Sequence, residues 1–281
     1  MDIYNDDYNK LNNNFICMVN SENTFPIINY QMQGGVKRHM INGIMKSKYI
    51  MITTNQLQIL DALLYDGGTK KYIDKKKKLR YSEHSGLFDL KKGSVDKIII
   101  SAKTNREDKD DNDILLPQSH VEQLKYEYIF HTHPATPYAG ARAISGIIYE
   151  WPSISDLYHF IYHYNEGEVL GSIIVAPEGI YMIQANKDVK YIDYPANNFF
   201  KKMENIQTTI QNEAIQKYGI DYSNHRQKIY YETVIQDETY INKYKKMVKK
   251  YFNNNIIIKY KARQYNKQMG KWIIDKLYIK Q

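Results

Sequence analysis

The chain lacks the features that would cross-link it or anchor it in a membrane. Its one cysteine, Cys17, excludes an intramolecular disulfide and a cysteine-based zinc knuckle, which fits a reducing compartment. No apolar run approaches the roughly 20 residues that a membrane-spanning helix needs, and the acidic start of the chain is unlike a signal peptide. We therefore expect an intracellular, cytoplasmic protein without membrane insertion, and we assign Cys17 no role.

In other respects the composition is that of a protein that can bury a core. Hydrophobic residues make up 43% of the 281 residues and charged residues 25%, enough for one large domain or a catalytic domain with an appendage. Lys, Asn, Ile and Tyr recur throughout, with 27 tyrosines. Because their codons are rich in A and T, we attribute this bias to genome composition. It would suit a large DNA virus, which would place the protein in the host cytoplasm or the virion.

Positive charge is concentrated towards the end of the sequence. The net charge is +8, and residues 187–281 hold 19 Lys and Arg against 9 Asp and Glu. Such a region could bind nucleic acid or an acidic partner, and the alternative is a solvated surface in a lysine-rich protein. Tyr244, Tyr251, Tyr260 and Tyr265 lie among these lysines. They could stack on bases or pack between helices, and we favour packing.

Residue patterns predict a helix early in the chain and then alternating strands and helices. Leu57, Leu60, Leu63 and Leu64 share one face of a helix over 53–65, which Asp66-Gly67-Gly68 is expected to end. Strands are predicted near 80–88, 95–101 and 126–130, helices near 119–125, 155–164, 199–218 and 230–252, a hairpin over 170–183 and a short strand over 256–258. We divide the chain into an N-terminal extension (1–48), a catalytic domain (49–186) and a basic, mostly helical C-terminal region (187–281).

One constellation of side chains carries recognisable chemistry. In Phe130-His131-Thr132-His133-Pro134, two imidazoles lie two residues apart, so on a strand both point to the same face. Both rings could then reach one metal at about 2.0–2.1 Å, the usual zinc–nitrogen distance. Asp156 offers a third ligand, because Ser153 can cap a helix whose first turn contains this aspartate. The sequence therefore predicts a zinc site.

This arrangement resembles the JAMM (MPN+) zinc metalloprotease family. The family pattern is a glutamate on an early strand, then His-x-His-Pro, then Ser-x-x-Asp, and here the match extends over residues 50–185. The resemblance assigns metal binding to His131, His133 and Asp156, and it places Ser153 beside the reacting carbonyl. It assigns the general base to Glu83, whose context Glu83-His84-Ser85-Gly86 is similar to the family's Glu-x-x-Gly.

The resemblance also implies a fold and an activity. The expected fold is α/β, with a curved mixed sheet packed with helices, JAMM/MPN-like and with cytidine-deaminase-like layering. The expected activity is that of a deubiquitinase-like metallopeptidase, which hydrolyses an amide or isopeptide bond in a protein or a ubiquitin-like conjugate. Zinc would lower the pKa of a bound water, and Glu83 would move its proton. The alternative is a catalytically inactive scaffold or binding protein that uses its basic tail.

Several features depart from the family pattern or compete with it. Here 22 residues separate His133 from Asp156, more than in the family, and we expect this insert (135–151) to lie at the rim of a cleft. Arg142 within it could contact an acidic or carbonyl group, or the insert is only a tolerated loop. The competing residues are Glu122 and Glu127 as alternatives to Glu83, His84 as a surface residue, and His159 and His163 as a second pair, which we expect to be packing residues.

Overall fold

A computed structural model describes residues 49–280 except 74–76, 78, 92, 105–115, 135–136 and 197. The predicted N-terminal extension, residues 1–48, and Cys17 lie outside the described residues. No described helix is both long enough and apolar enough to cross a membrane.

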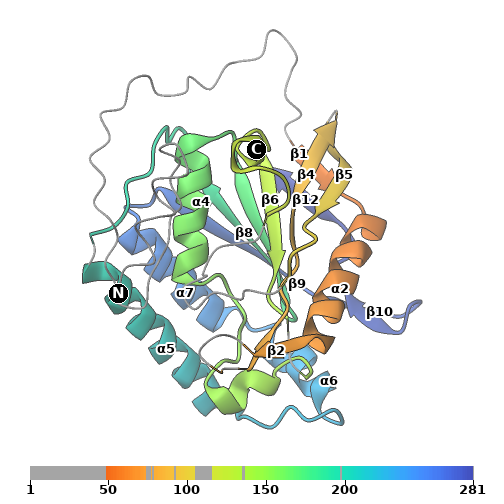
Figure 1. The fold of residues 1–281 in the computed structure, drawn as a ribbon. Coiled ribbons are helices and arrows are strands. Elements are labelled where there is room, and N and C mark those ends of the chain that lie inside the picture. The colour runs from red at the N-terminus through yellow and green to blue at the C-terminus, as the bar shows by residue number, and fades with distance from the viewer. Residues whose placement is uncertain are drawn as a thin grey trace.

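A mixed sheet of eight strands forms the centre of the molecule (Figure 1), in the order β12-β1-β5-β4-β6-β7-β8-β9. The strands are β1 (Tyr49–Ile52), β4 (Ser85–Lys91), β5 (Ser94–Ile100), β6 (Tyr128–Thr132), β7 (Gly171–Val175), β8 (Gly179–Ala185), β9 (Ile256–Ala262) and β12 (Leu277–Lys280). β6 and β7 are parallel neighbours, so the chain must cross over between them. That crossover contains η1 (Ala141–Ser145) and α4 (Ile154–Glu166). The general α/β class is therefore confirmed.

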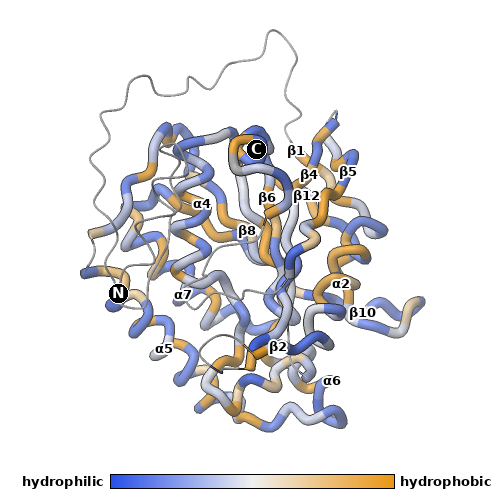
Figure 2. The backbone as a smooth tube through the Cα atoms, in the orientation of Figure 1, coloured by the Kyte–Doolittle hydropathy of each residue, from blue (hydrophilic) through white to orange (hydrophobic). Residues whose placement is uncertain are grey.

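The strands next to this crossover are apolar on both faces because helices cover both sides of the sheet. Ile129 and Ile174 face one core with α4, α5 (Asn198–Tyr218) and α7 (Thr239–Tyr251). Phe130 and Ile173 face the other core, which includes Leu57 and Leu60 of α2. This alternation follows from the two-residue period of a strand. Figures 1 and 2 show apolar strands between α4 and α2.

The first described helix, α2 (Thr54–Thr69), begins where the sequence predicts and ends later. Thr53 caps it and makes a reciprocal pair of hydrogen bonds with Gln56. The expected end at Asp66-Gly67-Gly68 is wrong, because the helix continues through both glycines. A Cβ on Gly67 would lie 2.3 Å from the Ser82 carbonyl oxygen. This glycine therefore allows the helix to approach the segment before β4.

The remaining short elements lie around the central sheet. They are β2 (Lys71–Ile73) and β3 (Leu79–Tyr81), which form a small hairpin, α3 (His120–Gln123), α6 (Gln227–Ile229), and the hairpin of β10 (Gln264–Asn266) and β11 (Lys271–Ile273). The predicted strand over 80–88 is thus two strands, β3 and β4, with residues 82–84 between them. The predicted hairpin over 170–183 is confirmed as β7 and β8.

The region after residue 186 differs from the mostly helical appendage that the sequence predicts. β9 (Ile256–Ala262) and β12 (Leu277–Lys280) are the two edge strands of the main sheet, so this region completes the same fold. The expected single helix over 230–252 is interrupted. A π-helix, η2 (Tyr230–Val234), precedes α7. The misreading has a physical cause, because a chain-distant strand such as β12 finds its partner, β1, only through tertiary pairing.

Candidate metal centre

The two predicted imidazoles converge at the end of β6. His131 lies within the strand and is 1% exposed. His133 follows it and continues the pairing, since its backbone N–H donates to the Val175 carbonyl at 2.9 Å. The two Nε2 atoms lie 3.0 Å apart. The i and i+2 positions therefore face the same space, as the strand pattern predicts.

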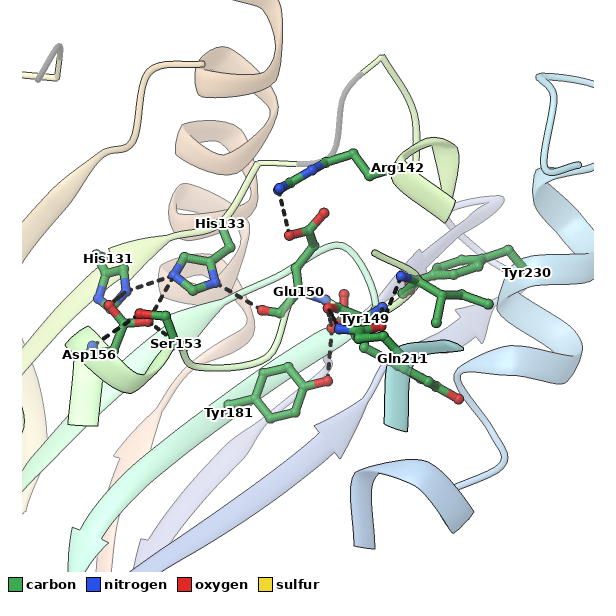
Figure 3. A network of polar contacts seen from close by, with 12 residues as sticks. His131, His133, Arg142, Tyr149, Glu150, Ser153, Asp156, Tyr181, Gln211 and Tyr230 are labelled. Atoms are coloured by element: carbon green, nitrogen blue, oxygen red, sulfur yellow. Dashed lines mark hydrogen bonds and ion pairs between the residues drawn. The ribbon is translucent and has the colours of Figure 1, made fainter. Parts of the chain in front are cut away.

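The third residue, Asp156, is oriented by the helix cap that precedes it. Ser153 donates its backbone N–H to Asp156 Oδ2 at 2.6 Å, and Asp156 returns its own N–H to Ser153 Oγ at 3.1 Å. The carboxylate then lies against both rings, with Oδ1 3.2 Å from His131 Nε2 and Oδ2 3.3 Å from His133 Nε2. Figure 3 shows these side chains pointing toward one another.

The two imidazole nitrogens are spaced closely enough to share one tetrahedral cation with the Asp156 carboxylate. Two ligands at about 2.05 Å from zinc and at the tetrahedral angle are about 3.3 Å apart. The two Nε2 atoms are 3.0 Å apart, and the distances of 3.2 and 3.3 Å join each of them to a different oxygen of Asp156. Among the described residues, His131, His133 and Asp156 form the one group of three potential ligands close enough to hold a metal.

The electrostatics of the group favour a cation. Burial alone would raise the pKa of Asp156, but the two imidazoles outweigh it and hold that pKa well below its ordinary 3.8. Burial opposes the charged form of His133 as well, yet Asp156, with smaller effects of Glu83 and Glu150, raises the pKa of His133 to about 9. A site that draws a proton this strongly carries a negative potential that a divalent cation would neutralise.

Hydrogen bonding selects the ring nitrogen that His133 presents. Its Nδ1 lies 2.9 Å from the carbonyl oxygen of Glu150, and a carbonyl can only accept, so Nδ1 carries the proton. In the neutral ring, the form that metal ligation requires, the lone pair of Nε2 then faces the site. His131 Nδ1 is buried and makes no hydrogen bond to any described residue.

The predicted base, Glu83, lies beside this group. It follows β3, is half-buried, donates its N–H to the Thr104 carbonyl at 3.2 Å, and lines the same cleft as His133, Ser153 and Asp156. The nearby Gly86 accounts for the Glu-x-x-Gly spacing, since a Cβ there would lie 2.2 Å from the Ile99 carbonyl oxygen. β4 can therefore pack closely against its neighbours and carry Glu83 to the end of β6.

The residue next to Glu83 and the two glutamates that compete with it as the base all lie outside the lining of the cleft. The expectation that His84 is a surface residue is wrong, because it is 7% exposed and its Nε2 lies 2.8 Å from Asp66 Oδ2. Its backbone also exchanges hydrogen bonds with Thr132, which fastens the Glu83 segment to β6. The competing Glu122 caps α3 through Ser119, and neither Glu122 nor Glu127 lines the cleft.

A cleft of about 800 Å³ opens over the centre. β3 and Glu83 line it on one side, and the insert lines it on another through η1 and residues up to Trp151. The expectation that the insert lies at a cleft rim is confirmed. Gln211 of α5 fixes the insert, as its Oε1 accepts from the N–H groups of Ile148 and Tyr149 at 3.0 and 3.1 Å. The insert therefore forms one wall of the cleft, and hydrogen bonds to α5 hold it in place.

Within that wall, Arg142 contacts an acid that sequence reasoning did not single out. Its Nη1 donates to Glu150 Oε2 at 2.7 Å, and the Glu150 side chain is 10% exposed. Burial raises the pKa of Glu150, while the charge of Arg142 opposes that rise. Glu150 lies next to Trp151-Pro152-Ser153, but a lone glutamate in an insert gives no signal that its carbonyl oxygen contacts His133.

The second histidine pair lies elsewhere in the fold. His159 and His163 face each other on α4 with their Nε2 atoms 3.2 Å apart, and His163 is 1% exposed. Among the described residues, no third potential ligand joins them. Neither lines the cleft.

Comparisons with known proteins give a viral relative. A protein of Acanthamoeba polyphaga mimivirus, described as uncharacterized, is 34% identical over 241 residues, which cover 82% of this chain and 65% of that protein. The chain thus spans less than two thirds of the length of this relative. No protein-family model matches, and no solved structure matches.

Proposed function

We propose that the protein is a zinc-dependent hydrolase of amide or isopeptide bonds, namely a deubiquitinase-like metallopeptidase. One observation carries the proposal: two imidazole nitrogens 3.0 Å apart converge with a carboxylate that lies 3.2 and 3.3 Å from them, and His133 and Asp156 line a cleft. Zinc with such a ligand set keeps a position open, typical of catalytic rather than structural sites. The likeness to JAMM metalloproteases remains part of this proposal.

The cation would supply a water of lowered pKa and would polarise the carbonyl of the scissile bond. The protein's own groups would complete the reaction. Glu83 would accept a proton from the attacking water as the new C–O bond forms, and would deliver it to the amine nitrogen as the C–N bond breaks. Ser153 Oγ accepts from Asp156 N–H, so its own proton can be donated to the developing oxyanion.

The cleft supports a macromolecular substrate. Its volume and its position between β3 and the insert would accommodate an extended peptide segment, and Leu79 and Ile144 at its mouth are 56% and 77% exposed. These two side chains would contact apolar groups of a peptide segment bound in the cleft. A protein or ubiquitin-like conjugate is therefore the substrate class that we propose.

A binding or scaffold role is the second candidate, because residues 187–281 are strongly basic. The intact ligand set argues against a purely inactive domain. For nucleic acid, the expected packing role is confirmed for Tyr244 and Tyr251, which are 0% and 9% exposed and cannot stack on bases, whereas Tyr265 is 52% exposed. The viral relative supports a large-DNA-virus origin, which we propose together with the function.

Hydrolysis by the zinc-loaded full-length protein tests the proposal. Lysine-linked diubiquitin and a fluorogenic peptide amide would serve as substrates, and Glu83→Gln should lower the rate by about 10²- to 10⁴-fold while the variant still binds zinc. Glu122→Gln, at an acid engaged in the cap of α3, is the matched control and should remain active. Equal activity of wild type and Glu83→Gln, or activity that survives removal of zinc, would refute the mechanism.

A further inference from the structure

Behind the metal centre lies a carboxyl group for which the proposed reaction has no use. Glu178 occupies the turn between β7 and β8 and is 0% exposed. Its backbone is held firmly, since its carbonyl oxygen accepts from Arg263 N–H and from the Tyr260 hydroxyl, both at 3.2 Å. The side chain therefore has a fixed origin, at the end of β7, the strand that pairs with β6.

The Glu178 carboxyl uses one of its oxygens twice. Oε1 accepts from the backbone N–H of Glu150 at 2.6 Å and from the Tyr181 hydroxyl at 2.8 Å. Oε2 is buried and makes no hydrogen bond to any described residue. An acid with an unpaired oxygen is an expensive choice for a core position, so packing alone does not account for it.

Glu150 connects this carboxyl to the metal centre. Its N–H is held by Glu178, and its carbonyl oxygen lies 2.9 Å from His133 Nδ1. Because both groups belong to one residue, fixing the N–H restricts the direction of the carbonyl. Figure 3 shows Glu150 between Tyr181 and His133, with the contact between Glu150 and His133 as a dashed line.

We propose that Glu178 is a positioning residue of the metal centre. By holding the Glu150 backbone it fixes the carbonyl that binds His133 Nδ1, which keeps Nε2 directed at His131 and Asp156. This inference rests on the proposed metal site and adds a residue that contacts neither metal nor substrate. Groups that orient a ligating histidine typically account for 10- to 100-fold in metal affinity. Since Glu178 acts through one intervening residue, we expect the lower end, about tenfold.

The test measures Co²⁺ binding to the full-length protein, by competition with a chelator and by the visible absorption spectrum of the bound ion. Glu178→Met removes the acceptor and keeps the length of the side chain, so it should bind Co²⁺ about tenfold more weakly and shift the absorption bands. Glu178→Gln keeps an oxygen for Glu150 N–H and should rescue both the affinity and the spectrum.

Asn165→Leu is the matched control for a purely structural effect. Asn165 also satisfies the backbone of a loop, exchanging hydrogen bonds with Ile192 at 2.9 and 3.0 Å, but no contact links it to His133. This variant should unfold at a lower temperature and bind Co²⁺ with unchanged affinity and spectrum. Should Glu178→Met fail to fold, Glu178→Asp, which withdraws the carboxyl by one methylene, gives the same comparison.

Two results would overturn the inference. One is a Glu178→Met or Glu178→Asp protein that binds Co²⁺ as tightly as wild type with the same spectrum. The other is a Glu178→Gln protein that binds as weakly as Glu178→Met, because the amide oxygen should replace the lost acceptor. A wild-type protein that binds no Co²⁺ would instead end the proposed function, together with any positioning role, and is distinguishable from both results.

Discussion

Two histidine pairs in this protein have similar ring spacing and different surroundings. His131 and His133 present their Nε2 atoms 3.0 Å apart, and His159 and His163 present theirs 3.2 Å apart. The strand pair has Asp156 at 3.2 and 3.3 Å, and its His133, with Asp156, lines a cleft. Among the described residues the helix pair has no such carboxylate and lines no part of that cleft. A histidine pair becomes a candidate metal centre through a third ligand and an opening for substrate.

The largest expected difference between the pairs is in metal content. His131→Ala or Asp156→Ala should reduce bound zinc from about one equivalent to none, because two remaining ligands do not hold the ion. His159→Ala should leave the zinc content unchanged, and His163→Ala should instead lower stability by about 1–3 kcal/mol, as the loss of a buried side chain does. Elemental analysis after desalting gives the stoichiometry. Zinc lost from the His159→Ala protein and kept in His131→Ala would reverse the assignment.

A smaller effect is expected from Glu178, which supports His133 of the strand pair through Glu150. Burial, and next the charge of Glu150, raise the pKa of Glu178 to about 7. The folded protein therefore keeps a proton on this carboxyl up to about pH 7, whereas the unfolded chain releases it near the ordinary 4.5. The stability contributed by the neutral carboxyl is full below about pH 4.5 and is lost as the pH rises to 7.

Comparing wild type with Glu178→Gln isolates that contribution. The free energy of unfolding of wild type should fall between pH 5 and 7 relative to Glu178→Gln, at no more than about 1.4 kcal/mol per pH unit. Denaturant unfolding at a series of pH values measures both proteins. Parallel pH profiles would show that Glu178 does not titrate in this range.

The smallest effect concerns the opening above the strand pair. Arg142 lines the cleft and contacts Glu150 at 2.7 Å, so Arg142→Gln should raise the KM for a peptide or conjugate substrate by about tenfold, the loss of one charge-assisted hydrogen bond, with little change in kcat. Arg226, which pairs with Asp221 at 2.8 Å outside the cleft, supplies the control Arg226→Gln. An unchanged KM in Arg142→Gln would remove this arginine from substrate binding.

Sequence patterns predict those parts of the site whose interactions join residues only a few positions apart in the chain. The same-face geometry of His131 and His133 follows from the strand period, and the orientation of Asp156 follows from the Ser153 cap. Both are interactions within a few residues, so the sequence contains them. The hairpin of β7 and β8 was predictable for the same reason, whereas the α/β class was expected from the resemblance to a family.

The parts that sequence reasoning missed depend on distant contacts. Gln211 satisfies the insert from 62 residues away, and Glu178 reaches Glu150 across 28 residues. No local signal marks either residue. The edge strand β12 was hidden within a lysine-rich region for the same reason, since its partner β1 lies far away in the chain, and only residues 256–258 of β9 were predicted. His84 was misread because its partner, Asp66, belongs to α2.

The most direct test of the metal centre is anomalous diffraction at the zinc absorption edge from crystals of the zinc-loaded protein. The account predicts one strong peak about 2.0–2.2 Å from His131 Nε2, His133 Nε2 and a carboxylate oxygen of Asp156. A map with no peak among these three side chains, or with its strongest peak between His159 and His163, would contradict it.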